Sequence, residues 1–328
     1  MNRINYYGTL GPACASYETL LEMFKVGMTG IRLNLSHVDL KDSREWLDNY
    51  NKAARMAGME PELLIDLEGP ELRIGNLKNS IGLKSGEFAI LGKKGIPVPS
   101  CIISTAEVGE KILLSDGLIE LYVKENQGDS LLCEVVHGGL LQSKKNIAIP
   151  RDNMNPTLTH RDYVNIKAAI NYGVTGIMLP FVRGKEDLIT LKEALLKENG
   201  QGIKIYAKLE NILGVKKLTE ILDYCDEIVI ARGDLGNSMP LWELPRIQKN
   251  ISEICRIKGK PFMVVTQMLN SMIENPVPTR AEVLDIYNAV LDGAASVMLT
   301  GETAQGKYPI AAMEYLIKTA EEALKRIN

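Results

Sequence analysis

Short apolar runs alternate with longer amphipathic stretches along most of this chain, and this alternation constrains the fold more than any other feature. Parallel β-strands need crossover connections, usually helices, so the pattern predicts an α/β fold with a parallel sheet. Eight such runs favour a closed (β/α)8 barrel, or TIM barrel. An open doubly wound sheet is the alternative, because counting strands does not show that a sheet closes. The predicted strands are 4–9, 30–35, 63–66, 176–181, 203–208, 227–231, 262–266 and 296–299, and helical patterns include 16–26, 40–57, 185–198 and 241–258.

The segment from residue 74 to residue 150 has a different pattern. Short alternating runs at 88–91, 111–114, 119–123 and 131–136 are separated by turn dipeptides such as Gly138-Gly139. They predict a small all-β domain, a β-barrel lid, inserted after the third strand. The catalytic barrel then comprises residues 1–73 and 151–328. Active sites of such barrels form at the C-terminal ends of the strands, so a domain inserted there can close over a ligand and exclude water.

The composition argues against several classes of function. The 328 residues carry a formal net charge of −3 and no basic stripe, which argues against a nucleic-acid partner. Gly, Pro or charged residues interrupt every apolar stretch, so no membrane-spanning segment is expected, and the first ten residues lack the apolar run of a secretory signal. Five cysteines lie far apart without a Cys-x-x-Cys pair, which predicts reduced thiols in a cytoplasmic protein.

Polar residues occur at the C-terminal ends of several predicted strands. Arg32, Asn34 and Ser36 share one face of the second strand, because side chains two residues apart point to the same side. A buried polar group without a partner costs about 1–3 kcal/mol. These three groups therefore need a cation or an anionic ligand, or else the hydrogen bonds of an ordinary barrel rim, and this segment alone leaves both interpretations open.

Lys208 and Glu210 repeat this pattern at the fifth strand, where a plain structural ion pair is the alternative. Asp234 follows Gly233 at the end of the sixth strand, where a tight turn and free N–H groups open a helical segment suited to anions. Two carboxylates on adjacent strand ends suit Mg²⁺, which keeps several water or substrate ligands. The alternative for Asp234 is an ordinary helix N-cap. Thr266 ends the seventh strand as a further polar candidate.

Two nucleotide-binding motifs are excluded. Residues 301–307 have the spacing of a phosphate-binding P-loop, but Tyr308 stands where a magnesium-binding Ser or Thr is required. The chain has no Gly-x-Gly-x-x-Gly after a predicted strand, so a dinucleotide-binding fold has no support.

Nine motifs together resemble the pyruvate kinase family over essentially the whole chain. They are Thr9-Leu-Gly-Pro-Ala13, Arg32-Leu-Asn-Leu-Ser-His37, Gly69-Pro-Glu-Leu-Arg73, Asp116-Gly-Leu-Ile119, Lys208-Leu-Glu-Asn211, Ala231-Arg-Gly-Asp-Leu-Gly236, Thr266-Gln-Met-Leu269, Asn275-Pro-Val-Pro-Thr-Arg-Ala-Glu282 and Gly301-Glu-Thr-Ala304. Each alone is only suggestive, whereas nine in the family's order are specific for homology.

The resemblance implies an enzyme that moves a phosphoryl group between phosphoenolpyruvate and ADP or another nucleoside diphosphate, with Mg²⁺ (or Mn²⁺) and K⁺ as cofactors. Within the family pattern, Lys208 stabilises the phosphoryl group and the enolate oxygen, Arg32 contacts the phosphoryl group, and Thr266 lies near the face where the enolate is protonated. The same resemblance assigns the substrate carboxylate to Gly233, Asp234 and Thr266, Mg²⁺ to Glu210 and Asp234, K⁺ to Asn34, Ser36, Asp66 and the Leu67 carbonyl, and the nucleotide to Asn34, His37, Arg73 and Lys145.

The chain departs from the family pattern at Glu68, Pro180 and Leu213, where a Lys, a Ser and an acidic residue are usual. These departures motivate two alternatives: a related phosphotransferase or lyase acting on another phosphorylated or oxo-acid substrate, or a metabolite-binding sensor without catalysis. The chain ends at Asn328, before the family's C-terminal regulatory domain, so the usual sugar-phosphate control is not expected. Any homo-oligomer would form through faces of the barrel.

Overall fold

The computed structural model describes residues 4–327 except residues 37, 70–71, 116 and 150–155. The chain divides into two compact units, one formed by Met1–Gly69 with Thr157–Asn328 and the other by Pro70–Pro156. The compact second unit therefore extends a few residues beyond both ends of the expected insertion.

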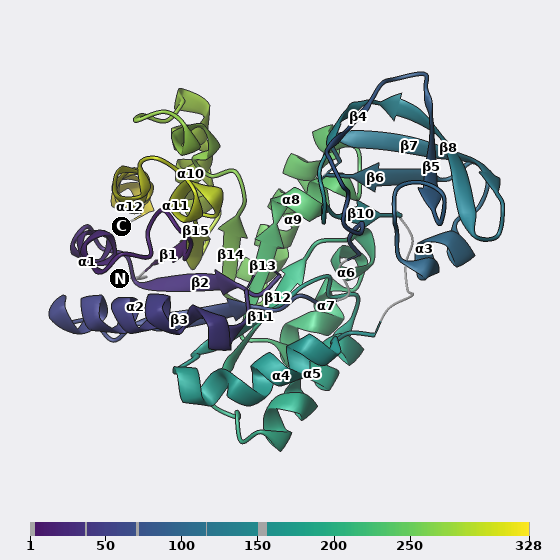
Figure 1. Ribbon diagram of the computed structural model, residues 1–328. Helices are drawn as coiled ribbons and strands as arrows, with labels where there is room; N and C mark the ends of the chain where they lie inside the picture. The colour runs from purple at the N-terminus through teal and green to yellow at the C-terminus, as the bar shows by residue number, and fades with distance from the viewer. Residues whose placement is uncertain (1–3, 37, 70–71, 116, 150–155, 328) are drawn as a thin grey trace. The chain divides into compact units, whose positions relative to one another are not determined.

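In the described residues of the first unit, eight parallel strands close into a barrel (Figure 1). This arrangement confirms the predicted (β/α)8 barrel, and the open doubly wound sheet is wrong. Around the barrel, the strands are β1 (Asn5–Thr9), β2 (Gly30–Asn34), β3 (Glu62–Asp66), β11 (Gly176–Leu179), β12 (Lys204–Leu209), β13 (Glu227–Ala231), β14 (Phe262–Val265) and β15 (Ser296–Met298).

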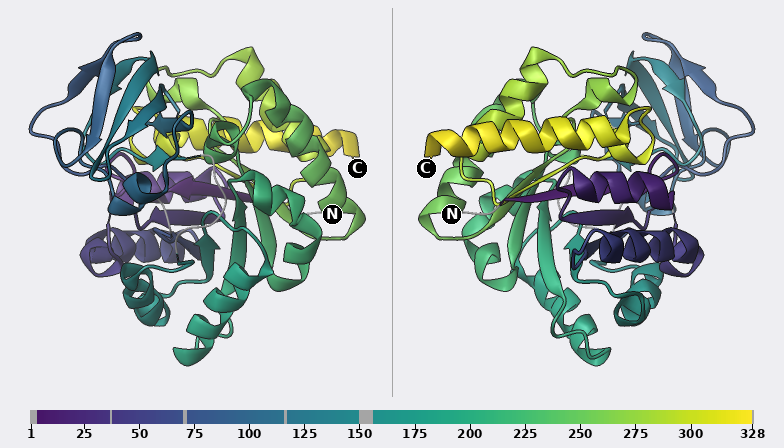
Figure 2. Two further views of the ribbon diagram at one scale, coloured as in Figure 1. Left: turned by 90° about the vertical axis from the view of Figure 1, so that its right-hand side faces the viewer. Right: turned by 90° about the vertical axis from the view of Figure 1, so that its left-hand side faces the viewer.

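Amphipathic helices cover the outside of the barrel. The longer ones are α1 (Tyr17–Lys25), α2 (Arg44–Met56), α4 (His160–Ala168), α5 (Lys185–Lys197), α9 (Leu244–Ile257), α10 (Arg280–Leu291) and α12 (Pro309–Ile327). Helix α2 illustrates why they pack, because Leu47, Tyr50 and Ala54 recur at helical spacing and are all buried. Helix α12 contacts both α1 and α10, and Figure 2 shows it on the outside of the barrel. No helix in the described part of the chain is long and apolar enough to cross a membrane.

The barrel interior is a packed core, and it places polar groups at the strand ends. Tyr7, Leu64 and Tyr206 belong to a buried interior cluster contributed by several strands. Two strands carry glycine where the tyrosine rings need room: a Cβ on Gly30 would come within 2.6 Å of Tyr7 Cε1, and one on Gly176 within 2.6 Å of Tyr206 Cε2. Because the middle of the barrel is filled, any ligand has to lie beyond this layer, at the strand ends.

Strands β11 and β14 end earlier than predicted, and the same backbone feature ends both. Strand β11 ends at Leu179 and β14 at Val265. Phe181 and Thr266, which the predicted strands included, have positive φ values of 52° and 82°. An extended strand cannot contain such a residue, because β-structure needs negative φ.

The second unit has its own sheets and its own core. Its strand pairs are antiparallel, and the described strands form one five-stranded sheet and a separate two-stranded sheet. In sheet order they are β10 (Ile147–Ala148), β6 (Lys111–Leu114), β7 (Ile119–Asn126), β8 (Ser130–His137) and β5 (Phe88–Gly92), then β4 (Ile81–Leu83) with β9 (Gly139–Leu141). Buried residues including Leu91, Leu121 and Val135 form the core.

The second unit differs from the expected all-β barrel in two respects. Its described strands form two sheets and not one closed barrel. A short helix, α3 (Ser100–Thr105), also occurs where the β-branched residues of Ser-Cys-Ile-Ile-Ser-Thr favour extended structure. The Pro99 immediately before α3 is compatible with a helix start, because proline leaves the first turn undisturbed.

Candidate active site

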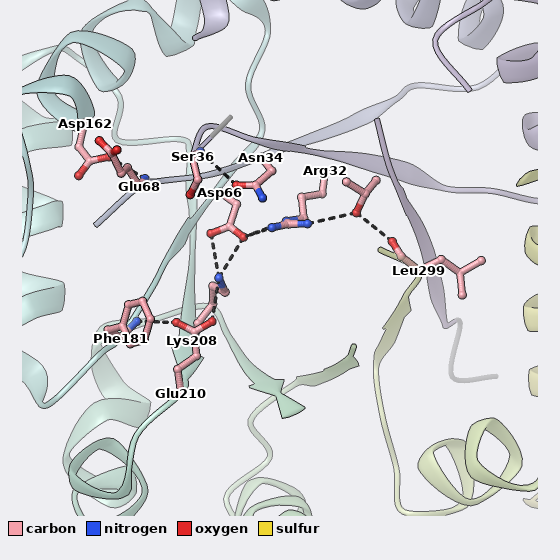
Figure 3. A network of polar contacts seen from close by, with 11 residues as sticks. Arg32, Asn34, Ser36, Asp66, Glu68, Asp162, Phe181, Lys208, Glu210 and Leu299 are labelled. Carbon is pink, nitrogen blue, oxygen red and sulfur yellow. Dashed lines mark hydrogen bonds and ion pairs between the residues drawn. The ribbon is translucent and has the colours of Figure 1, made fainter. Parts of the chain in front are cut away.

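Arg32, Asp66, Lys208 and Glu210 meet at the C-terminal ends of three barrel strands (Figure 3). Arg32 donates to Asp66 Oδ2 from Nε at 2.8 Å and from Nη2 at 2.6 Å. Lys208 Nζ lies 3.0 Å from the same oxygen and 2.9 Å from Glu210 Oε1. Residues two apart on a strand share a face, so these side chains continue the interior face of the barrel beyond its apolar layer. Two cations and two carboxylates thus form one continuous chain.

This chain of contacts holds Asp66 and Lys208 in their charged forms. Asp66 is only 1% exposed, and burial alone would disfavour its ionisation. Lys208 and Arg32 outweigh burial and lower the pKa of the Asp66 carboxyl below its usual value. For Lys208, burial opposes the charge, but Asp66 and Glu210 raise the pKa of the ammonium group above its usual value. Lys208 is therefore a fixed positive charge and a poor proton donor near neutral pH.

Each end of this chain is anchored to a strand or loop. Arg32 Nη1 donates to Thr9 Oγ1 at 3.3 Å, and that hydroxyl donates to the Leu299 carbonyl at 2.9 Å. At the other end, Glu210 Oε2 accepts from the backbone N–H of Phe181 at 2.8 Å. Phe181 is the residue with positive φ after β11, so a strained turn and Glu210 hold each other in place. The simple ion-pair interpretation of Lys208 and Glu210 is incomplete, because both belong to this wider network.

Asp234 lies in the short helix α8 (Arg232–Asn237), which follows β13 directly. The N-cap position of α8 belongs to Ala231, so the alternative of Asp234 as the helix N-cap is wrong. Gly233 in the same helix lies against Thr266, since a Cβ on Gly233 would be 3.2 Å from Thr266 Cγ2. Gly233 and Thr266, which are both predicted to bind the substrate carboxylate, are therefore neighbours at the ends of the adjacent strands β13 and β14.

Asn34, Ser36, Asp66 and Leu67 lie on the adjacent strands β2 and β3 or directly after them. Asn34 pairs in register with Asp66, and the Ser36 N–H donates to Asn34 Oδ1 at 3.1 Å. Leu67 is buried, and its N–H donates to the Met178 carbonyl. The structure therefore places these residues together at the ends of two neighbouring strands.

The predicted nucleotide residues are divided between the two units, and one is not described. His37 lies outside the described residues. Arg73 and Lys145 belong to the second unit, where they are close together: Arg73 Nη1 donates to the Lys144 carbonyl at 2.9 Å, and the Ile74 N–H donates to the Lys145 carbonyl at 2.9 Å. These contacts show that the chain segments carrying Arg73 and Lys145 lie side by side in that unit.

Glu68 and Pro180, two of the departures from the family pattern, have local partners in the barrel unit. The Glu68 carboxylate lies 3.5 Å from Arg161 Nη1. Pro180 packs against Gly69, since a Cβ on Gly69 would be 2.3 Å from Pro180 Cγ. The reversed charge at Glu68 is therefore partly neutralised by Arg161. Leu213 lies in the helix α6 (Ile212–Lys216) after β12.

Sequence reasoning missed several residues that hold the candidate site in shape. Arg232 binds the Thr266 carbonyl, and Asp162, which is fully buried, accepts hydrogen bonds from the N–H groups of Glu68 and Gly69. Glu302 is also buried and accepts from the Leu269 N–H. Arg232 and Glu302 lie inside motifs that were recognised, so a charged residue next to a strand-end glycine was the signal available for both.

The donor chemistry of the site fits the expected metal ions. Among the described residues, no three His, Cys, Asp or Glu side chains gather as a metal site, so a divalent ion would rely on two carboxylates. Glu210 and Asp234 are such a pair, and Mg²⁺ commonly takes one or two carboxylates together with water and substrate oxygens. Asn34, Ser36, Asp66 and Leu67 offer only oxygen donors, which suit a hard monovalent cation. The Asp66 oxygens already accept from Arg32 and Lys208, but a carboxylate has further lone pairs.

Comparisons with known proteins support the family resemblance that the nine sequence motifs indicate. A family model described as "Pyruvate kinase, barrel domain" matches residues 1–313. The pyruvate kinase of Geobacillus stearothermophilus is 39% identical over 97% of this chain and 57% of its own length. That of Bacillus licheniformis is 36% identical over 100% of this chain and 58% of its own length, and that of Clostridium perfringens is 36% identical over 98% and 70%. The chain thus spans little more than half the length of the first two relatives.

Proposed function

The chain belongs to the pyruvate kinase family, and we propose that its barrel transfers a phosphoryl group between phosphoenolpyruvate and a nucleoside diphosphate such as ADP. The observation that carries this proposal is the buried chain from Arg32 through Asp66 and Lys208 to Glu210. It supplies two fixed positive charges at the strand ends, and helix α8 with Gly233 and Asp234 follows β13, the strand that pairs with β12 of Lys208. A doubly anionic phosphate ester with a carboxylate suits such a surface.

In the forward direction, the bond between the enol oxygen and phosphorus breaks, and a bond from phosphorus to the terminal phosphate oxygen of the nucleotide forms. Arg32 binds the transferring phosphoryl group, and Lys208 stabilises the negative charge that develops on the enolate oxygen. The raised pKa of Lys208 supports this electrostatic role over a role as proton donor. The enolate then takes a proton at its methylene carbon, on the side of Thr266, and becomes pyruvate.

The remaining roles follow the family pattern. The amides of Gly233 and Asp234, with Thr266, hold the substrate carboxylate. Glu210 and Asp234 hold Mg²⁺ or Mn²⁺, and Asn34, Ser36, Asp66 and Leu67 hold K⁺; when bound, these ions supply positive charge that offsets the phosphoryl and carboxylate oxygens. Asn34, His37, Arg73 and Lys145 face the nucleotide. The lid role of the insertion at residues 74–150, a cytoplasmic location and a homo-oligomer built through barrel faces also stay predictions.

The test is an assay of pyruvate release from phosphoenolpyruvate with Mg²⁺, several nucleoside diphosphates, and K⁺ present or absent. We expect nucleotide-dependent turnover that increases with K⁺. Lys208→Met removes the fixed charge, and we expect a loss of about 100-fold or more in kcat with the fold retained. Lys204→Met is the matched control: it makes the same change on the same strand β12, but Lys204 pairs with Glu62 at the other end of that strand.

Three outcomes would contradict the proposal. Near-normal turnover by Lys208→Met would remove Lys208 from the reaction. Binding of phosphoenolpyruvate without product, in a folded wild-type chain, would favour the sensor alternative. Pyruvate formed from another oxo acid, without phosphoenolpyruvate or a nucleoside diphosphate, would favour the lyase alternative.

A further inference from the structure

The segment that follows strand β14 has an unfavourable backbone conformation that something must maintain. Thr266 and the next residue, Gln267, have φ values of 82° and 55°. Positive φ is unusual for any residue except glycine, and a β-branched residue such as threonine is a genuine outlier there. Conformations of this kind persist only where surrounding contacts impose them.

The first of these contacts is a guanidinium clamp from Arg232, the residue that begins helix α8. Arg232 donates to the Thr266 carbonyl from Nε at 3.1 Å and from Nη2 at 2.7 Å. Its remaining edge is held by Asp285 Oδ2, which lies 2.6 Å from Nη1, and Nη2 also lies 3.0 Å from Met268 Sδ. The Arg232 side chain is 12% exposed, so water competes little for these contacts. The rigid fork of arginine suits a carbonyl and a carboxylate held at fixed angles.

The second contact fixes the other end of the segment. Glu302 is 1% exposed, and its Oε1 accepts from the Leu269 N–H at 3.0 Å. Its Oε2 accepts from the Thr300 N–H at 2.7 Å and from Thr300 Oγ1 at 3.1 Å. Residues 266–269 are therefore tied to the end of β13 by Arg232 and to the end of β15 by Glu302.

The conformation of Thr266 decides where its side chain points. Its Cγ2 would lie 3.2 Å from a Cβ on Gly233, so the Thr266 side chain packs closely against this glycine. If the segment relaxed to negative φ, the Thr266 hydroxyl would turn away from the position it now has beside Gly233. A hydroxyl that serves a reaction at that place would lose its alignment, although no ligand-contacting atom had been removed.

We propose that Arg232, oriented by Asp285, is a positioning residue that imposes the left-handed backbone conformation of Thr266 and so aims its side chain at the substrate. The consequence for catalysis rests on the proposed phosphotransfer, whereas the conformational part does not. Arg232 needs no contact with substrate for this role.

The test compares Arg232→Met, which removes the guanidinium, with Arg232→Lys, which keeps the charge but lacks the fork, and with Asp285→Asn. Arg246→Met is the matched control, because Arg246 is exposed on α9 and pairs only with the nearby Glu243 among the ion pairs of the described residues. Three quantities are measured in each variant: φ at residue 266 from a crystal structure or from ¹³C chemical shifts, kcat and KM for phosphoenolpyruvate, and the exchange of pyruvate methyl hydrogens with deuterium oxide in the presence of Mg²⁺ and K⁺.

In Arg232→Met we expect a negative φ at residue 266, a kcat lowered by about 100-fold and a KM changed by less than about threefold. Deuterium exchange should fall in parallel with kcat, because Thr266 lies on the protonation side. Arg232→Lys and Asp285→Asn should fall between wild type and Arg232→Met, and Arg246→Met should match wild type. If Arg232→Met does not fold, these two milder variants decide the matter by the same measurements.

Unchanged φ at residue 266 in the Arg232 and Asp285 variants would overturn the proposal, as would a raised KM with unchanged kcat. If the wild-type chain shows neither turnover nor exchange, the proposed function has failed. The φ of residue 266 then still decides whether Arg232 positions Thr266.

Discussion

Two buried carboxylates in the barrel have opposite surroundings. Asp66 lies between Arg32 and Lys208, and these cations outweigh burial and lower its pKa. Glu227 begins β13, is 7% exposed, and shares its strand face with Val229 of the interior cluster. Burial raises the pKa of Glu227 to about 7, because neither the nearby Ser296 nor Lys204 offsets the desolvation. The partners of a carboxylate, and not its depth alone, decide its charge.

Because the pKa of Glu227 is raised in the folded state, the free energy of unfolding falls as pH rises and Glu227 loses its proton. The folded pKa is about 7 and the ordinary value is 4.5, so the folded state binds more protons between these values. Stability contributed by the protonated form is complete below about pH 4.5 and is lost as pH rises through 7. Glu227→Gln keeps the neutral form at all pH values, so we expect it to exceed wild type by about 3 kcal/mol at pH 8 and to match it near pH 4.5.

Urea unfolding of wild type and Glu227→Gln at several pH values measures this difference. The negative charges of Glu62 and Asp226 also raise the pKa of Glu227. The pH profile of wild type is therefore compared with that of Glu227→Gln and is not interpreted alone. Glu193→Gln, an exposed position on α5, should leave the wild-type pH profile unchanged. A constant difference between wild type and Glu227→Gln across this pH range would contradict the assignment.

At the scale of elements, two helices begin with capping boxes that also anchor loops. In α4, Thr159 and Asp162 cap each other, and the Asp162 carboxylate also accepts from the N–H groups of Glu68 and Gly69. In α10, Glu282 of the box formed with Thr279 likewise accepts from the Ser271 N–H at 2.7 Å. The helix N-termini thus hold the chain that follows β3 and β14, at the end of the barrel where the candidate site lies.

Removing the shared carboxylate of α4 should cost more than removing an ordinary cap. Asp162→Asn leaves an amide group facing several N–H donors, so we expect a loss of about 3 kcal/mol in unfolding free energy. Thr279→Ala removes only the hydroxyl of the corresponding box in α10 and should cost about 1 kcal/mol. Thermal and urea unfolding compare the two, and equal losses would show that the contacts of Asp162 with residues 68 and 69 contribute nothing.

At the scale of the whole molecule, the closure of the barrel depends on interior volume as well as on strand number. Gly30 lies opposite Glu62 and beside the Tyr7 ring, and a Cβ there would be 2.6 Å from both the Glu62 carbonyl oxygen and Tyr7 Cε1. Small residues on β2 and β11 therefore balance the large tyrosines on β1 and β12.

Gly30→Ala should destabilise the barrel by about 1–3 kcal/mol, because the backbone contact cannot move without disturbing the strand pair. Gly202→Ala is the control, since a Cβ at Gly202 would have nothing within 4 Å. Urea unfolding measures both. A Gly30→Ala chain as stable as Gly202→Ala would show that the strands can move apart to accept the extra carbon.

The sequence by itself determined the features that depend on near neighbours. Alternating apolar runs and helical spacing identified all eight barrel strands, and the same pattern identified Lys208, Glu210 and Thr266 as polar residues at strand ends. Such patterns are readable because a strand or helix repeats its own geometry over a few residues.

Only the tertiary structure decided which distant residues meet. Asp66 contacts Arg32, which is 34 positions away, and Lys208, which is 142 positions away, and both contacts need the registers of several strands around a closed barrel. The clamp between Arg232 and Thr266 likewise depends on a turn whose positive φ contradicts the preference of threonine for extended structure. Helix α3 and the two sheets of the second unit escaped prediction for the same reason, because packing against neighbours there outweighs the local preference of each short segment.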